Sequence, residues 1–88
     1  MKAVYEVNIH NEYNHESIYD LRDKYVKWFE TQKEAISYAR SIKKELKEIC
    51  KSMDNIICLD VNKYYFDEEE LNEEFWGIVY SINVVGKY

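Results

Sequence analysis

One long amphipathic helix, with segments of alternating hydrophobicity on both sides, most constrains the fold of this 88-residue chain. Thr31-Gln32-Lys33-Glu34 forms a capping box, in which the threonine oxygen accepts a hydrogen bond from the backbone three residues on and the glutamate reaches back. After it, apolar residues recur three and four positions apart: Ala35, Ala39, Ile42, Leu46, Ile49 and Met53. This spacing predicts a helix of about 20 residues with one apolar face, ending near residues 52–55.

Four other segments predict β-strands, because apolar and polar side chains alternate along them. Residues 2–10 and 25–29 precede the helix, and residues 55–66 and 76–85 follow it. Residues 11–23 show no clean period, and we interpret them as a long connection. The predicted order of elements is therefore β-β-α-β-β.

A helix with one apolar face can cover one face of one sheet, so this order predicts a single α+β domain over residues 1–88. We expect a two-layer sandwich with a four-stranded, mainly antiparallel sheet. Short connections favour the strand order second, first, third, fourth. The face under the helix is expected to carry Tyr5, Val7, Ile57, Leu59, Ile78, Tyr80 and Ile82. The other face is expected to carry Glu6, Asn8, His10, Asp60, Asn62, Ser81 and Asn83.

The composition excludes several classes of protein. No apolar run exceeds six residues, whereas a membrane span needs ~20. The first residues lack the apolar stretch of a secretory signal. We therefore expect a soluble protein of the bacterial cytoplasm with no membrane partner, and we expect Cys50 and Cys58 to be free thiols packed as small hydrophobic residues.

Neither a metal site nor a catalytic centre is predicted. His10 and His15, with Glu12 and Glu16 nearby, are the only candidate metal cluster, but a spacing of five does not place both imidazoles on one helical face. Asp60, together with Cys58 and Asn62, is the only group of polar side chains in a predicted strand or helix that is a candidate for catalysis. The sequence contains no glycine-rich phosphate loop and no nucleophile elbow. We expect no cofactor, no metal and no enzymatic activity.

The most unusual segment lies between the last two predicted strands. Six of the eight residues at positions 67–74 are acidic, and aromatic residues stand on both sides. Asp67 can cap a short helical turn that Leu71 and Phe75 pin to the core. One interpretation is a solvated connection. The other is a recognition surface whose carboxylates steer a basic partner and whose aromatic residues anchor it. That surface comprises Tyr64, Tyr65, Asp67, Glu68, Glu69, Glu70, Glu73, Glu74 and Trp76.

A basic band along the predicted helix gives an alternative site. It comprises Lys33, Arg40, Lys44, Lys47 and Lys51, which can meet phosphates but more often form a solvated face. A net charge of −5 opposes nucleic acid. The charge is also uneven, because residues 1–44 carry +1 and residues 45–88 carry −6. A module that stacks RNA bases on an open sheet is disfavoured, since the predicted open face is polar.

Residues 29–39 (FETQKEAISYA) resemble a strand-to-helix corner common in small α+β proteins of phages and other mobile elements. With its length, acidity and aromatic content, the chain is similar in style to phage-encoded anti-defence proteins, including anti-CRISPR inhibitors. This resemblance implies stoichiometric inhibition by occupation of a nucleic-acid groove of a host enzyme.

The leading hypothesis from the sequence is a non-enzymatic binding protein that docks its acidic segment in a basic cleft of a protein partner, in the manner of a nucleic-acid mimic. Two alternatives remain open. One is a nucleic-acid-binding protein that uses the basic band, and the other is a structural protein that forms homo-oligomers.

Overall fold

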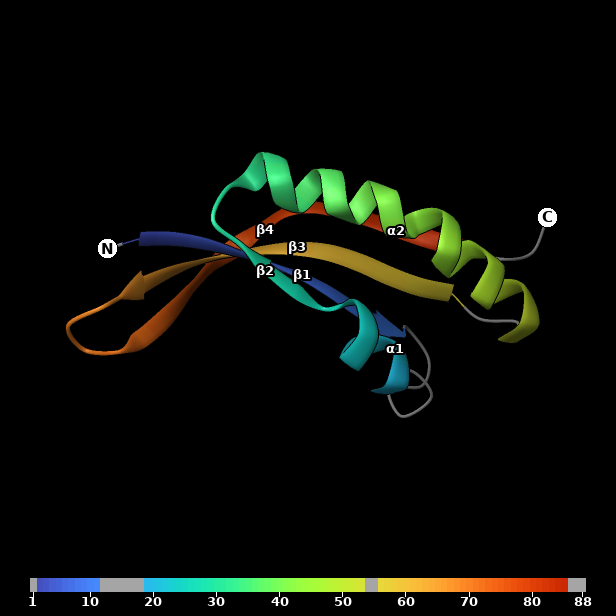
Figure 1. Ribbon diagram of the computed structural model, residues 1–88, viewed down its shortest axis with the longest axis horizontal. Helices are drawn as coiled ribbons and strands as arrows, with labels where there is room; N and C mark the ends of the chain where they lie inside the picture. Colours follow the sequence, from blue (N-terminus) through green and yellow to red (C-terminus); the bar gives the residue numbers. More distant parts are fainter. Residues whose placement is uncertain (1, 12–18, 54–55, 86–88) are drawn as a thin grey trace.

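The computed structural model describes residues 2–11, 19–53 and 56–85. The elements along the chain are β1 (Lys2–Asn11), α1 (Tyr19–Tyr25), β2 (Lys27–Phe29), α2 (Gln32–Met53), β3 (Ile56–Asp67) and β4 (Asn72–Val85). The strands form one antiparallel sheet in the order β2-β1-β3-β4, and α2 lies across one face of it (Figure 1). The predicted α+β class and the predicted strand order are both confirmed. The sheet face that points away from α2 is called the open face below.

Helix α2 begins at the predicted capping box. The backbone N–H of Glu34 donates to Thr31 Oγ1 at 3.2 Å, and the threonine hydroxyl donates to Glu34 Oε1 at 2.8 Å. One face of the helix, with Ala35, Ala39 and Leu46, is completely buried against the sheet. The helix ends at Met53, within the predicted range.

The core lies between α2 and the two central strands. β1 and β3 pair without interruption from Lys2↔Phe66 to Asn11↔Ile57, so their inward-facing residues form two adjacent rows. Those rows and one residue of β4 are almost completely buried, and each aliphatic side chain contributes ~1.5–3 kcal/mol through burial. They comprise Val7, Ile9, Ile57, Leu59, Val61 and Val84.

The expected connection at residues 11–23 is wrong in part, because it contains the start of α1, and Tyr25 belongs to this helix rather than to a strand. Long-range contacts hold the helix end. The buried Tyr25 donates from its hydroxyl to Glu45 at 2.8 Å, and its carbonyl accepts from the Tyr38 hydroxyl at 2.7 Å. Such contacts leave no periodic signal in the sequence. Residues 12–18 lie outside the described part of the chain.

Strand β4 begins at Asn72, four residues before the prediction, and contains two β-bulges. The pairing changes from Val61↔Tyr80 to Asn62↔Ile78, so Val79 is an additional residue in β4. A bulge reverses the alternation of side chains between the two faces. Ile78, which was predicted to face the helix, therefore lies exposed on the open face.

The molecule is elongated, with extents of 46 × 25 × 19 Å. Figure 1 shows that the β3–β4 hairpin continues past the beginning of α2, so this end of the sheet has no helix over it. In the described ranges, neither helix is both long and apolar enough to cross a membrane.

Candidate protein-interaction surface

The end of the β3–β4 hairpin, residues 64–78, is called the arm. It contains all nine residues predicted to bind a partner, together with Phe75 and Ile78. Four of its apolar side chains are more than half exposed: Leu71 (78%), Trp76 (59%), Ile78 (56%) and Phe75 (55%). Exposed apolar residues gathered in one projecting segment indicate a contact surface.

The turn of the arm is a tight hairpin turn and not the expected helical turn. Asp67 pairs with Asn72, and Asp67 Oδ1 accepts hydrogen bonds from the backbone N–H groups of Glu69 at 2.9 Å and Glu70 at 3.4 Å. Asp67 therefore caps the turn in the way that aspartate stabilises turns generally. Leu71 and Phe75 are exposed, so the expectation that they pin this segment to the core is wrong.

Leu71 occupies a strained position at the tip. Its φ is 54°, in the left-handed region that side chains with a Cβ rarely adopt. This conformation costs about 1–2 kcal/mol for a leucine, and with 78% of its surface exposed the side chain gains little from burial in return. The fold therefore gives no reason for a leucine at this position.

A second bulge decides which arm residues share a side. The pairing changes from Lys63↔Gly77 to Tyr64↔Phe75, which makes Trp76 the additional residue. Because β3 keeps its alternation, Tyr64 and Phe75 lie on the open face, while Lys63 lies on the helix side. The nine predicted residues are therefore divided between two sides and do not form one patch.

On the open face, aromatic rings form a row from β2 to β4. The ring centroids of Trp28 and Tyr64 are 5.2 Å apart, and those of Tyr64 and Phe75 are 5.4 Å apart in an edge-on arrangement. Both distances are typical of favourable aromatic pairs. We call Trp28, Tyr64 and Phe75 the aromatic stripe. About half of Trp28 is exposed, as is Phe75, so the stripe is accessible.

Two carboxylates accompany the stripe. Burial, followed by the negative charges of Glu6 and Glu73, raises the pKa of Tyr64 above its ordinary value. Like any tyrosine, the phenol is protonated at neutral pH and is a hydrogen-bond donor there. Glu6 is itself held in place by Asn62, whose Nδ2 donates to Glu6 Oε1 at 3.2 Å.

On the helix side, one lysine lies among three aromatic rings. Lys63 Nζ is 4.9 Å from the ring centroid of Trp76, 5.2 Å from that of Tyr65 and 5.9 Å from that of Tyr5. In such cation–π contacts the ammonium group is attracted to the negative faces of the rings. This side of the arm is therefore already occupied by a cation of the chain itself.

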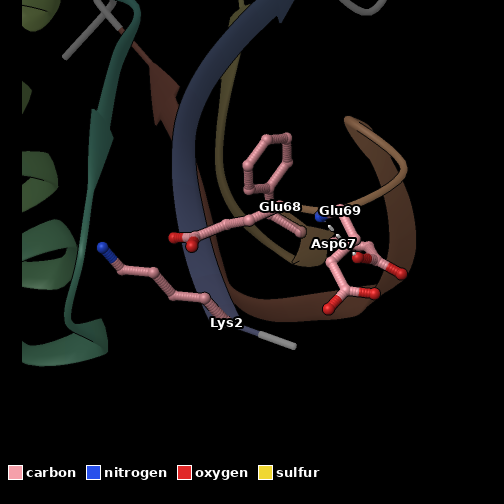
Figure 2. A pocket seen from close by; sticks show the side chains of 5 residues that line it. Lys2, Asp67, Glu68 and Glu69 are labelled. Carbon is pink, nitrogen blue, oxygen red and sulfur yellow. Dashed lines mark hydrogen bonds between the residues drawn. The ribbon is translucent and has the colours of Figure 1, made fainter.

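A shallow hollow separates the turn of the arm from the beginning of β1. Lys2, Phe66, Asp67, Glu68 and Glu69 line it. Figure 2 shows Glu68 directed toward Lys2, with the carboxylates of Asp67 and Glu69 further round the turn. Lys2 Nζ is bound to Glu30 at 2.9 Å, and this bond lowers the pKa of the Glu30 carboxyl.

Several of the polar residues predicted for the open face pair with one another across β3. Ser81 Oγ donates to Asp60 Oδ1 at 2.6 Å, and His10 Nδ1 lies 3.4 Å from Asp60 Oδ2. Asp60 and Asn62 are buried even though they face away from α2. Only 7% of Asp60 is exposed, so little of it is accessible to a substrate.

The cysteine and metal predictions have different outcomes. Cys58 is a free thiol, as expected, but it lies half-buried on the open face, where its thiol donates to Asn83 Oδ1 at 3.3 Å, and is not simply packed as a small hydrophobic residue. The side chains of Cys50, His15, Glu12 and Glu16 lie outside the described part. Within that part, no group of three or more His, Cys, Asp or Glu residues is placed to hold a metal ion.

The basic band lies on the exposed side of α2. Lys33, Arg40, Lys44 and Lys47 are all exposed, whereas the side chain of Lys51 is outside the described part. Arg40 leans toward β4, with its guanidinium carbon 5.9 Å from the ring centroid of Tyr80.

The aromatic content of the open face was missed. The face was expected to be polar, yet Trp28, Tyr64, Phe75 and Ile78 all lie on it. Trp28 can be assigned to this face only from its register opposite Glu6, and Phe75 and Ile78 only from the bulges in β4. The signals available in the sequence were the clustering of aromatic residues around positions 64–76 and, for Tyr64, its alternation with Asp60 and Asn62.

No known protein family, curated protein or solved structure matches this chain.

Proposed function

We propose that this chain is a non-enzymatic binding protein whose arm docks on a basic surface of a protein partner. The observation that carries the proposal is the combination of exposure and charge in the arm. Four large apolar side chains are exposed there beside six carboxylates, at the end of the sheet that α2 does not cover.

The two kinds of side chain have complementary roles in association. Carboxylates gathered at one end of the molecule attract a positively charged partner and orient the encounter. Aromatic and aliphatic side chains then supply the contact that excludes water, which is where most binding free energy arises. A purely solvated connection would not need Leu71, Phe75 and Trp76 on its surface.

A nucleic-acid-binding enzyme is the partner class that we propose first. Its basic groove normally meets phosphates, and the carboxylates of the arm carry charge of the same sign. The resemblance of the chain, in length, acidity and aromatic content, to small anti-defence proteins of phages favours a host defence enzyme among such partners. The arm would then act as a stoichiometric inhibitor that competes with nucleic acid.

Capture from bacterial extract with quantitative mass spectrometry tests the proposal. Three forms of the full chain are immobilised: the wild type, an arm variant with Glu68, Glu69 and Glu70 changed to Gln, and a basic-band variant with Lys33, Lys44 and Lys47 changed to Gln. Asp67 is kept in all three because it caps the turn. We expect the arm variant to lose the captured proteins and the basic-band variant to retain them.

The same experiment separates the alternatives. Captured proteins should be released by added DNA, since DNA competes for the same basic groove. Equal capture by the wild type and the arm variant would contradict the proposal. Loss confined to the basic-band variant would favour nucleic-acid binding through α2 instead.

A further inference from the structure

The open face of the arm carries an apolar surface that the fold itself does not require. The aromatic stripe extends from β2 to β4, and Ile78 lies on the same face. Trp28, Phe75 and Ile78 remain about half exposed, while the core that joins the sheet to α2 lies on the opposite face. Scattered apolar residues on a surface are ordinary, but neighbouring ones indicate a contact site.

The charged groups around this surface are mainly carboxylates, and the lysines of the sheet are engaged elsewhere. Glu6 pairs with Trp28, and Glu73 precedes Phe75 by two residues in β4, so both residues lie on the open face beside the stripe. The described strands contain three lysines. Lys27 and Lys63 contact rings on the helix side, and Lys2 is bound to Glu30.

We propose that the aromatic stripe binds an arginine-bearing segment of a protein partner. This inference rests on the proposed function and adds which side of the arm is used and which residue type is recognised. A guanidinium group can lie over an aromatic ring while it donates paired hydrogen bonds to a carboxylate. Trp28, Tyr64 and Phe75 supply the rings, and Glu6 and Glu73 supply the carboxylates.

Other occupants fit the surface less well. Nucleic-acid bases stack on aromatic rings, but their phosphates would approach Glu6 and Glu73. A second copy of the chain brings the same negative charge to the contact. A lysine ammonium is a compact charge that neither stacks as a plane nor binds a carboxylate in a bidentate manner.

The test uses the full chain, isotope-labelled for NMR, and peptides of defined chemistry. The first peptide alternates arginine and leucine, and two matched peptides carry lysine or glutamate in place of arginine. We expect the arginine peptide to shift the Trp28 indole and Phe75 signals, the lysine peptide to bind at least about threefold more weakly, and the glutamate peptide not to bind.

Two neighbouring substitutions provide the matched control. Phe75 and Trp76 are equally exposed and adjacent in β4, but they lie on opposite sides of the arm. Phe75→Ala should weaken binding of the arginine peptide by about two- to fivefold, which is the range of one lost cation–π contact at an exposed site. Trp76→Ala should leave it unchanged.

Several results would overturn the inference. One is the absence of any shift with the arginine peptide at millimolar concentration, and another is loss of binding in Trp76→Ala but not in Phe75→Ala. Loss of binding only in Trp76→Ala would place the contact on the helix side and would leave the proposed function intact. Failure of the proposed function would instead appear as equal capture by the wild type and the arm variant. Tighter binding of oligothymidylate, or concentration-dependent shifts at the stripe without peptide, would identify nucleic acid or a second copy as the occupant.

Discussion

Ser81 Oγ donates a 2.6 Å hydrogen bond to Oδ1 of Asp60, a carboxylate that the fold buries on the face away from α2. A buried carboxylate is tolerated only when hydrogen bonds replace the water that it has lost. Ser81 supplies one such bond from β4, and His10 approaches the other oxygen from β1. Asp60 therefore connects three strands through its side chain.

Removal of the serine hydroxyl should destabilise the protein. We expect Ser81→Ala to lower the free energy of unfolding by about 1–3 kcal/mol, because a hydrogen bond to a carboxylate is lost and a buried acceptor is left with fewer partners. Urea unfolding measures the change. Ser41→Ala is the matched control, since the Ser41 hydroxyl bonds to a carbonyl of its own exposed helix surface, and we expect a change below about 0.5 kcal/mol. Equal losses in the two variants would contradict the structural role of the Asp60 bond.

The bulge at Val79 has a direct consequence for stability. Because Ile78 lies exposed on the open face, Ile78→Ser should change the free energy of unfolding by less than about 0.5 kcal/mol. Leu59→Ala, at a fully buried position of the neighbouring strand, should cost about 2–5 kcal/mol. Urea unfolding of both variants compares them. A large loss in Ile78→Ser would mean that Ile78 faces the core, as an unbroken alternation predicts.

These features show which parts of the fold are accessible from sequence. The capping box at Thr31 and the apolar face of α2 are local patterns, so the helix, the sheet and their order could be predicted. The bulges at Val79 and Trp76 arise from the pairing of β4 with β3, and no periodic pattern in the sequence of β4 indicates them. Helix α1 was missed for a related reason, since Tyr25 is held by residues of α2.

The same reasoning applies to the candidate site. The acidic and aromatic composition of the arm could be predicted, because it is visible in a single stretch of sequence. The division of Tyr64 and Tyr65 between two sides follows from alternation alone. The approach of Trp28 to Tyr64, however, depends on the register of β2 against β1 and of β1 against β3. Residues from separate segments meet only through that register.

Leu71 gives a prediction that links stability to function. Glycine has no Cβ and adopts a positive φ without strain, so Leu71→Gly should raise the free energy of unfolding by about 0.5–1 kcal/mol. Leu71→Ala keeps the Cβ and should give no such gain. Urea unfolding of the two variants provides the comparison. If Leu71 contacts a partner, Leu71→Gly should also reduce the capture of proteins from bacterial extract. A variant that is more stable and yet captures less would show that Leu71 contributes to binding and not to the stability of the fold.

The titration of Tyr64 provides a test of the open-face geometry. Because its pKa is raised, the folded protein retains the phenol proton at a pH where the unfolded chain has lost it. This contribution to stability is complete below the ordinary tyrosine pKa of about 10, and it is lost as the pH rises through the higher pKa of the folded state. NMR of carbon-labelled tyrosine can follow Tyr64 through this range.

Two substitutions should lower the pKa of Tyr64 by different amounts. Burial is the largest cause of the shift, so Trp28→Ala, which removes the neighbouring ring, should bring the pKa closer to its ordinary value than Glu73→Gln, which removes one nearby charge. Trp76→Ala serves as the control, because this ring contacts Lys63 on the helix side, and it should leave the titration unchanged. A Tyr64 that titrates like free tyrosine in the wild type, or that responds to Trp76→Ala and not to Trp28→Ala, would contradict the arrangement of the aromatic stripe.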